Sequence, residues 1–361
     1  YYRSNGLVRH PGGYRGEDID VLYDFVNSGR PDRRDWCNQH VRDEVLQRGF
    51  DRQSGDWNEF WAGRDYALQL DRVRAAVLMA HAFNDWNVMP EHSVRVYAAL
   101  KQKGVPCMAY FHQGGHGGPP PLALMNRWFT RFLHGVDNGV ERDPRAWIVR
   151  EGEREPTSYP DYPHPDAAPV TLYPGPGGAA IGTLASTRPA EADQERLTDD
   201  VRIDGTKLAS SPESPHRLLF ATAPLREPLH VSGTASIEVS LASSKPAANF
   251  SVWLVALPWE RGPITNNIVT RGWADPQNHQ SLTRGEPLAP GVFRTLRFEL
   301  QPDDQVVPVG KQLALMLFCS DRDFTLWPEP GTELTIDLAA TSITVPVVGG
   351  EAALARALEP R

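Results

Sequence analysis

The sequence contains few cysteines, and their placement excludes several kinds of protein. Only three occur among the 361 residues: Cys37, Cys107 and Cys319. They lie far apart and form no C-x-x-C pair, which argues against a disulfide framework and against a zinc ribbon. At least one thiol must be unpaired, and none stands at a predicted helix start that would activate it, so we expect all three to serve as packing residues.

Long apolar runs and a basic charge are also missing. No stretch of about 18 apolar residues occurs, so the sequence predicts no membrane span. Lys and Arg number 37 against 45 Asp and Glu, a net charge of −8 without a segregated basic patch, which disfavours nucleic acid as a partner. The composition, with 40% hydrophobic and 23% charged residues, is that of a globular protein. At about 150 residues per domain, the length predicts two domains.

The first 150 residues show the pattern of an α/β domain. A polar helical pattern over 17–70, broken at Arg30-Pro31 and at Gly49, predicts two or three helices. The short apolar run 75–80 is typical of a strand that is buried on both faces of a parallel sheet.

A second strand and two more helices are predicted after this run. One helix begins at Pro90 and stops at Gly104, which is the usual asymmetry of Pro at the start and Gly at the end. A strand over 105–112 follows, and a helix around Trp128 ends near Gly135. This strand, helix, strand, helix order predicts the end of a parallel sheet.

The composition changes near Glu151. Residues 151–189 are rich in Pro and Gly, which predicts a linker with one strand at 170–173. Beyond it, short apolar stretches alternate in the strand period, as in 235–241, and no helical period is evident. An antiparallel β-sandwich is therefore expected. Its predicted strands cover 217–221, 236–241, 250–257, 292–300, 311–318 and 334–344.

A carboxylate follows the first predicted strand of the α/β part, and a histidine follows the second. Asp85 comes directly after the strand, and His116 lies 31 residues later in a glycine-flanked loop. The carboxyl ends of parallel strands are where α/β enzymes place catalytic groups. Asp before His is also the order of the α/β-hydrolase triad, in which the Asp fixes the imidazole tautomer. We therefore expect Asp85 and His116 to be a catalytic pair.

Each residue has a simpler explanation when taken alone. Asp85 could cap the helix at Pro90 or close an Asx turn, and His116 could be a surface histidine. Their placement at successive strand ends favours catalysis. His112 and His116 have a spacing that metal ligands use, but they span a strand end and a Gly-Gly turn, so no metal is expected.

The nucleophile of such a triad is not encoded in these residues. The hydrolase elbow requires Gly-x-Ser-x-Gly, and no serine here has a glycine two residues before it. The chain therefore holds two members of a triad.

Five stretches together resemble the Xaa-Pro dipeptidyl-peptidase family of serine exopeptidases, which is related to cocaine-esterase-type hydrolases. The resemblance extends over essentially the whole chain, and the stretches that carry it are 1–8, 16–22, 84–88, 114–116 and 270–275. It implies the carboxyl-terminal part of an α/β-hydrolase fold over 1–150, with a helical cap over about 17–70. A linker and a jelly-roll-like β-sandwich follow over 151–361. The aromatic residues of the cap are then expected to form mostly its core, with a minority facing the substrate: Trp36, Trp57, Phe60 and Trp61.

The resemblance also implies roles for individual residues. Glu17 matches an acidic residue that binds the free α-amino group of the substrate, Tyr1 or Tyr2 matches a pocket tyrosine, and Asn87 matches a polar residue near the substrate backbone. Without the resemblance, Glu17 could favour its own helix dipole, the tyrosines could be packing residues and Asn87 could be a turn residue.

The expected function is that of a serine-type dipeptidyl-peptidase that releases Xaa-Pro dipeptides from peptide amino termini. Its serine, in the amino-terminal half of the family, would lie upstream of Tyr1, on a segment that we expect to remain bound. No metal or organic cofactor, nucleic acid or membrane is implied. Self-association into a homo-oligomer and the cellular compartment are left open, with secretion favoured slightly over the cytoplasm.

The sequence is compatible with two other functions. One is an esterase or acylase on the same scaffold, whose pocket would not need the Glu17 carboxylate. The other is an inert fragment whose sandwich binds a carbohydrate or a protein partner. In that case three tryptophans could form a sugar platform, although packing is the expected role: Trp253, Trp259 and Trp273.

Overall fold

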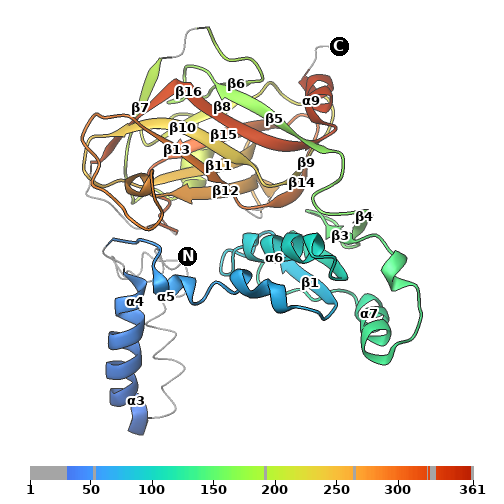
Figure 1. Ribbon diagram of the computed structural model, residues 1–361. Coiled ribbons are helices and arrows are strands. Elements are labelled where there is room, and N and C mark those ends of the chain that lie inside the picture. Colours follow the sequence, from blue (N-terminus) through green and yellow to red (C-terminus); the bar gives the residue numbers. More distant parts are fainter. Residues whose placement is uncertain are drawn as a thin grey trace.

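Two β-sheets organise the chain. The computed structural model describes residues 31–51, 54–190, 193–262, 266–322, 324–325 and 331–358. A four-stranded sheet has the order β1-β2-β3-β4, and a twelve-stranded sheet contains β5 to β16. Figure 1 shows the larger sheet folded into a sandwich that is stacked on the part carrying β1 to α7.

The smaller sheet is parallel where the sequence predicts it. Its elements are β1 (Val77–Ala82), α6 (Glu91–Gln102), β2 (Cys107–His112), α7 (Leu122–His134), η3 (Val140–Arg142), β3 (Ala146–Val149) and β4 (Thr157–Tyr159). β1 pairs with β2 and β2 with β3 in parallel, whereas β4 is antiparallel to β3. The side chains of β2 are buried along nearly its whole length. The apolar run 75–80 predicts burial on both faces for the first strand instead, and this is wrong for the described β1, whose side chains are mostly half-buried.

The helices of this part begin and end at the predicted signals. Pro90 precedes the first residue of α6, and Gly104, one residue past its C-cap, has φ +69°. α7 ends at Gly135, whose φ of +72° is left-handed. Glycine adopts this conformation without the steric cost that other residues meet, which explains why both helices stop there.

A helical segment precedes the smaller sheet. It consists of α3 (Pro31–Cys37), the π-helical η1 (Asn38–Gln47), α4 (Arg48–Phe50), α5 (Glu59–Ala62) and the 3₁₀ helix η2 (Tyr66–Arg72). The first three form one continuous helix that passes through Gly49, where a break was expected. Figure 1 places this helix apart from both sheets. Trp36 and Trp57 are 60% and 42% exposed, so the expectation that they form a core is wrong for these two.

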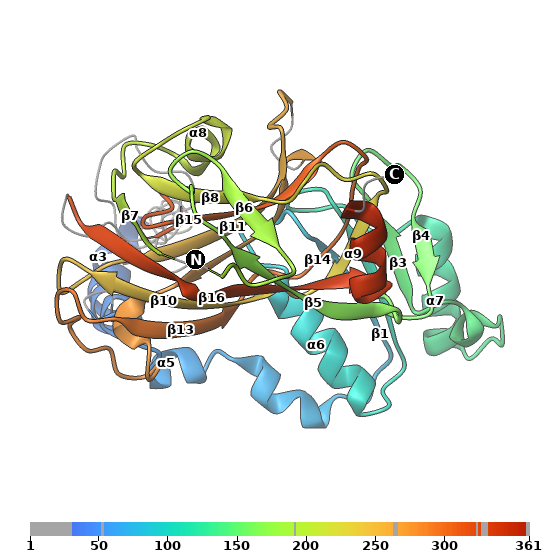
Figure 2. The same ribbon diagram turned by 90° about the horizontal axis from the view of Figure 1, so that it is seen from above.

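The sandwich contains most of the strands. Its elements are β5 (Ala167–Pro174), β6 (Gly182–Ala185), β7 (Gln194–Thr198), α8 (Gly205–Ser210), β8 (Arg217–Ala221), β9 (Leu229–Gly233), β10 (Ser236–Ser243), β11 (Phe250–Leu257), β12 (Ile268–Ala274), η5 (Pro276–Asn278), β13 (Arg294–Glu299), β14 (Asp303–Val307), β15 (Gln312–Phe318), β16 (Glu333–Val348) and α9 (Gly350–Leu358). Figure 2 shows β16 and β5 passing over one end of α6.

Some strands of the sandwich have continuous apolar sequences because both of their faces are buried. β8, β11 and β15 are buried on both faces, because one face lies in the main core between the sheet layers and the other contacts a second cluster under α8. α8 and α9 are helices that the strand-period pattern did not predict. Three strands, β4, β5 and β6, form within 151–189, where a linker with one strand was expected.

Candidate active site

Asp85 lies in the turn after β1 and is almost completely buried, with 3% of its surface exposed. Its Oδ1 accepts hydrogen bonds from the amides of Asn87 and Val88, both at 3.0 Å. This is the Asx turn that the sequence offers as the simpler explanation. The turn occupies only one carboxylate oxygen, so Oδ2 is available to a second partner.

That second partner is His116. Its Nδ1 lies 2.9 Å from Oδ2 of Asp85, although the two residues follow different strands. Because β1 and β2 are parallel and adjacent, their carboxyl ends meet at one edge of the sheet. The His116 side chain is 67% exposed, whereas the carboxylate behind it is buried. The structure therefore brings the two predicted residues into the geometry of a triad acid and base.

Asp85 is held in its charged form. Burial alone would raise the pKa of this carboxyl group, but hydrogen bonds from the Val88 amide, the His116 ring and the Asn87 amide outweigh it and place the pKa below 3.8. A carboxylate that stays charged can orient the imidazole and stabilise the imidazolium that forms during proton transfer.

His81 is a further neighbour of this carboxylate. Its Nε2 lies 2.9 Å from the carbonyl oxygen of Val88 and 3.3 Å from Oδ2 of Asp85, and its Nδ1 lies 2.6 Å from the hydroxyl of Ser93. An imidazole that donates from Nε2 and accepts at Nδ1 satisfies all three contacts. His81 therefore supports the turn after β1 and shares Oδ2 of Asp85 with His116.

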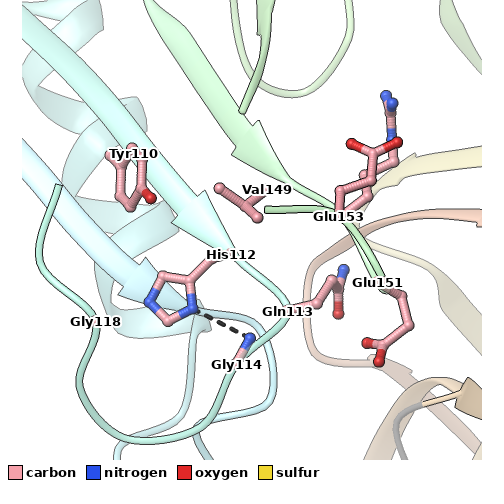
Figure 3. A pocket seen from close by; sticks show the side chains of 10 residues that line it. Tyr110, His112, Gln113, Gly114, Gly118, Val149, Glu151 and Glu153 are labelled. Carbon is pink, nitrogen blue, oxygen red and sulfur yellow. Dashed lines mark hydrogen bonds between the residues drawn. The ribbon is translucent and has the colours of Figure 1, made fainter. Parts of the chain in front are cut away.

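The glycine loop that carries His116 is folded around a second imidazole, that of His112. The amide of Gly114 donates to His112 Nδ1 at 3.1 Å, as Figure 3 shows. A methyl group at Gly118 would lie 2.7 Å from His112 Nε2, and one at Gly114 would lie 2.8 Å from Nδ1. The glycines of this loop thus allow the backbone to approach His112 closely. Burial lowers the pKa of His112, which favours the neutral ring that accepts the Gly114 hydrogen bond.

A cavity of about 330 Å³ lies beside this loop. Its lining residues are Tyr110, His112, Gln113, Gly114, Gly118, Val149, Arg150, Glu151, Gly152 and Glu153 (Figure 3). His116 is not among them, so the cavity adjoins the loop beside His112 and not the contact between Asp85 and His116.

The residue after Asp85 contacts the sandwich. Arg271 stacks on the Trp86 ring at 3.6 Å, and its guanidinium also lies over Trp253 and Phe324 at about 5 Å. The indole nitrogens of Trp253 and Trp273 both donate to the Asp321 carboxylate. Trp253 is therefore a buried packing residue and cannot serve as a sugar platform.

The remaining predicted residues are placed as follows. Glu17, Tyr1 and Tyr2 lie outside the described residues. Asn87 is beside Asp85, and its backbone amide donates to the Asp85 carboxylate. Its expected contact with the substrate stays a prediction.

Two negative findings apply to the described ranges alone. Within them, no three His, Cys, Asp or Glu side chains converge to hold a metal ion, and no helix is long and apolar enough to cross a membrane.

Several supporting residues were not predicted from the sequence. His81 and His112 stand at the ends of the two strands that lead to the Asp85 and His116 loops, and this position is a signal that could have found them. Asn84 and Gln113 also contact each other, with the Asn84 side-chain amide donating to Oε1 of Gln113 at 2.8 Å. No local pattern indicates this contact, because it joins loops 29 residues apart.

The fold and the site together define a class of protein. Parallel strands that end in a buried Asp and an exposed His, followed by an antiparallel sandwich, are the carboxyl-terminal part of an α/β-hydrolase with an appended β-domain. Solved structures show the same fold. An aminopeptidase from a marine sediment Thaumarchaeota archaeon aligns with a TM-score of 0.67, covering 84% of this chain and 62% of its own, at 16% identity. A CocE/NonD family hydrolase from Staphylococcus aureus aligns with a TM-score of 0.64, covering 82% and 58%, at 13% identity.

Sequence comparison identifies the family. Residues 1–118 match the model of the X-Pro dipeptidyl-peptidase (S15 family), and residues 138–356 match the X-Pro dipeptidyl-peptidase C-terminal non-catalytic domain. The chain is 55% identical over 356 residues to a Rhodopirellula baltica protein named "Putative Xaa-Pro dipeptidyl-peptidase". The match covers 97% of this chain and 57% of that protein, so the chain spans little more than half of its relative. The chain belongs to the X-Pro dipeptidyl-peptidase family.

Proposed function

We propose that this chain forms part of a serine-type dipeptidyl-peptidase that releases Xaa-Pro dipeptides from peptide amino termini. The observation that carries the proposal is the 2.9 Å contact between Nδ1 of His116 and the buried Asp85 carboxylate. Membership of the X-Pro dipeptidyl-peptidase family supports the substrate class.

The geometry fits the two halves of acyl transfer. Because Asp85 accepts a hydrogen bond from Nδ1–H of His116, Nε2 carries a lone pair at the exposed end of the ring. In the proposed reaction, Nε2 removes the proton of a serine hydroxyl as its oxygen attacks the carbonyl carbon of the proline. The same proton passes to the leaving amine, and an acyl-enzyme forms. Water then attacks the acyl carbon as His116 takes its proton, and this proton passes to the serine oxygen when the ester bond breaks and the dipeptide leaves.

Besides the proline, the enzyme is proposed to recognise the free amino terminus of the substrate. Glu17 is proposed to bind the α-amino group, because an ion pair removed from water discriminates strongly against an uncharged terminus. Tyr1 or Tyr2 and Asn87 are proposed to contact the substrate beside the serine.

The serine is proposed to reside on a segment outside the 361 residues, and two described surfaces fit such a segment. β1 is an edge strand of the described four-stranded sheet, yet most of its side chains are apolar. An edge of this kind is a template for another strand. On α7, three side chains spaced seven and four residues apart form an exposed apolar stripe: Leu122, Phe129 and Leu133. We propose that the same segment covers both surfaces.

The test uses protein expressed from the complete reading frame. Release of p-nitroaniline is measured from Gly-Pro-p-nitroanilide and from its N-acetylated counterpart. Cleavage of the free form alone supports the proposal. Hydrolysis of a simple ester with both peptides left intact would overturn the peptidase assignment and favour an esterase on this scaffold.

A further inference from the structure

Two acidic residues at the start of β14 point from the sandwich toward the catalytic loops. Asp303 and Asp304 are 5% and 0% exposed, so their side chains depend on partners inside the protein. Oδ1 of Asp304 has such partners, and its buried Oδ2 has none among the described residues. The side-chain amide of Gln113 meets both of them. Its Nε2 donates to Oδ1 of Asp303 at 2.6 Å and to the carbonyl oxygen of Asp304 at 2.9 Å.

Gln113 is also the point where the two catalytic loops are joined. It is the first residue of the loop that ends in His116, and it is 6% exposed. The Nδ2 group of Asn84, the residue before Asp85, donates to Oε1 of Gln113 at 2.8 Å and to its carbonyl oxygen at 3.0 Å. One side chain therefore contacts the Asp85 loop through its oxygen and the sandwich through its nitrogen.

The orientation of the Gln113 amide is determined by its partners. The carbonyl oxygen of Asp304 can only accept, so the group facing it must be the NH₂ of Gln113. Oε1 then faces Asn84, whose NH₂ donates to it. A glutamate of the same shape could not make these contacts, because a carboxylate has no hydrogen to give to β14. Figure 3 shows the Gln113 side chain directed away from the His112 ring.

The sandwich side of the contact is held by further bonds. Oδ1 of Asp303 also accepts from the amide of Asp304 at 2.7 Å, and the Tyr162 hydroxyl donates to the Asp303 carbonyl at 3.1 Å. The Asp304 carboxylate accepts from Arg150 at 3.2 Å and lies 3.0 Å from Nε2 of His230. Because these groups are buried and hydrogen-bonded to one another, they have little freedom to move. The loops that hydrogen-bond to them are therefore held in position.

We propose that Gln113 is a positioning residue. Through it, β14 of the sandwich holds the Asp85 and His116 loops at the relative position in which the His116 ring contacts the Asp85 carboxylate. This inference rests on the proposed function. It gives the β-domain, which the family description calls non-catalytic, a part in catalysis without contact to the substrate. Gln113 acts through Asn84 on one loop and through its own backbone on the other.

The experiment uses the complete protein with Gln113→Glu. This substitution keeps the shape of the side chain and places a carboxylate against Asp303. We expect kcat to fall about 10- to 100-fold, because small displacements of catalytic groups have effects of that size, while KM changes less than about twofold. The loss should be equal for Gly-Pro-p-nitroanilide and a p-nitrophenyl ester, since both reactions need the same Asp85 and His116 pair.

A further variant separates positioning from general stability. Tyr162→Phe removes a hydrogen bond from the same interface but keeps the ring that packs on Phe83, so it should lower Tm and leave kcat within about twofold. An equal fall of kcat in Tyr162→Phe would overturn the proposal.

A readout without substrate keeps the test independent of the peptidase assignment. The proton on Nδ1 of His116 is followed by NMR in folded wild-type and variant proteins. We expect its resonance to broaden or disappear in Gln113→Glu and to persist in Tyr162→Phe. An unchanged resonance together with unchanged kcat would overturn the inference. Should Gln113→Glu fail to fold, Gln113→Met, which adds no charge, is measured in the same way and must show the same loss.

Discussion

Nδ1 of His116 contacts Oδ2 of Asp85 at 2.9 Å, and the other oxygen of the same carboxylate accepts two backbone amides. Asp85 thus serves the turn after β1 and the imidazole at once. Because the turn immobilises the carboxylate, the imidazole is held in one orientation and one tautomer.

Replacing Asp85 by asparagine should therefore lower activity severely. The amide side chain would present an NH₂ group or a weaker acceptor to His116 and favour the wrong tautomer, and the expected fall in kcat is about 10⁴-fold. Steady-state kinetics of the complete enzyme on Gly-Pro-p-nitroanilide measure it. Asp143→Asn, which breaks a partly exposed ion pair with Arg127, is the control and should stay within about twofold of wild type. Wild-type kcat in Asp85→Asn would rule out its role in the triad.

Asp85 should also contribute to stability in a pH-dependent way. Its pKa in the folded protein is below 3.8, so folding stabilises the charged form. This contribution is fully present above the pKa of the unfolded chain and is lost as the pH falls through the lower pKa of the folded protein. Urea unfolding between pH 7 and pH 3 should show a steeper loss of stability below about pH 4 for wild type than for Asp85→Asn. Parallel curves for the two proteins would contradict the assignment.

Glu17→Gln tests recognition of the free amino terminus. Loss of the carboxylate should lower kcat/KM for Gly-Pro-p-nitroanilide by at least about tenfold, because a buried ammonium group would lose its partner. Hydrolysis of a simple ester serves as the internal control and should change little. If the preference for the free over the N-acetylated peptide persists, another residue binds the amine.

The glycine loop offers a matched pair of substitutions. Gly117 and Gly118 both have positive φ, +109° and +96°, so alanine is strained at either position. Only at Gly118 would the new methyl group strike His112, and no atom lies within 4 Å of it at Gly117. We expect Gly118→Ala to be less stable than Gly117→Ala by about 1–3 kcal/mol and to have the lower kcat. Denaturant unfolding and kinetics on both variants check this, and equal values would mean that the loop does not depend on His112.

The apolar stripe of α7 gives a test of the proposed upstream segment. Leu133 is 72% exposed in the described structure. Leu133→Lys should destabilise the complete protein by about 2 kcal/mol if the segment buries this side chain, since a charge would then replace a packed Leu. Leu282→Lys, at a position that is 74% exposed on a sandwich loop, should have an effect below about 0.5 kcal/mol. Equal effects of the two substitutions would argue that the segment does not cover α7.

The amino-acid sequence by itself determined the local elements and the order of the catalytic residues. Helix α7 ends at Gly135, and β8 and β11 cover the predicted residues, because apolar period, glycine and proline act over a few positions. The pairing of Asp85 with His116 was predictable because adjacent parallel strands bring their carboxyl ends together.

Only the tertiary structure decided which distant groups support that pair. β7, β9, β12 and β14 gave no signal that distinguished them from loops, since their burial depends on partners elsewhere in the sandwich. The contact between Gln113 and Asp303 joins residues 190 positions apart. No local pattern encodes such a contact, because it exists only once the sandwich is packed on the hydrolase part, where both polar groups lose water and must satisfy each other.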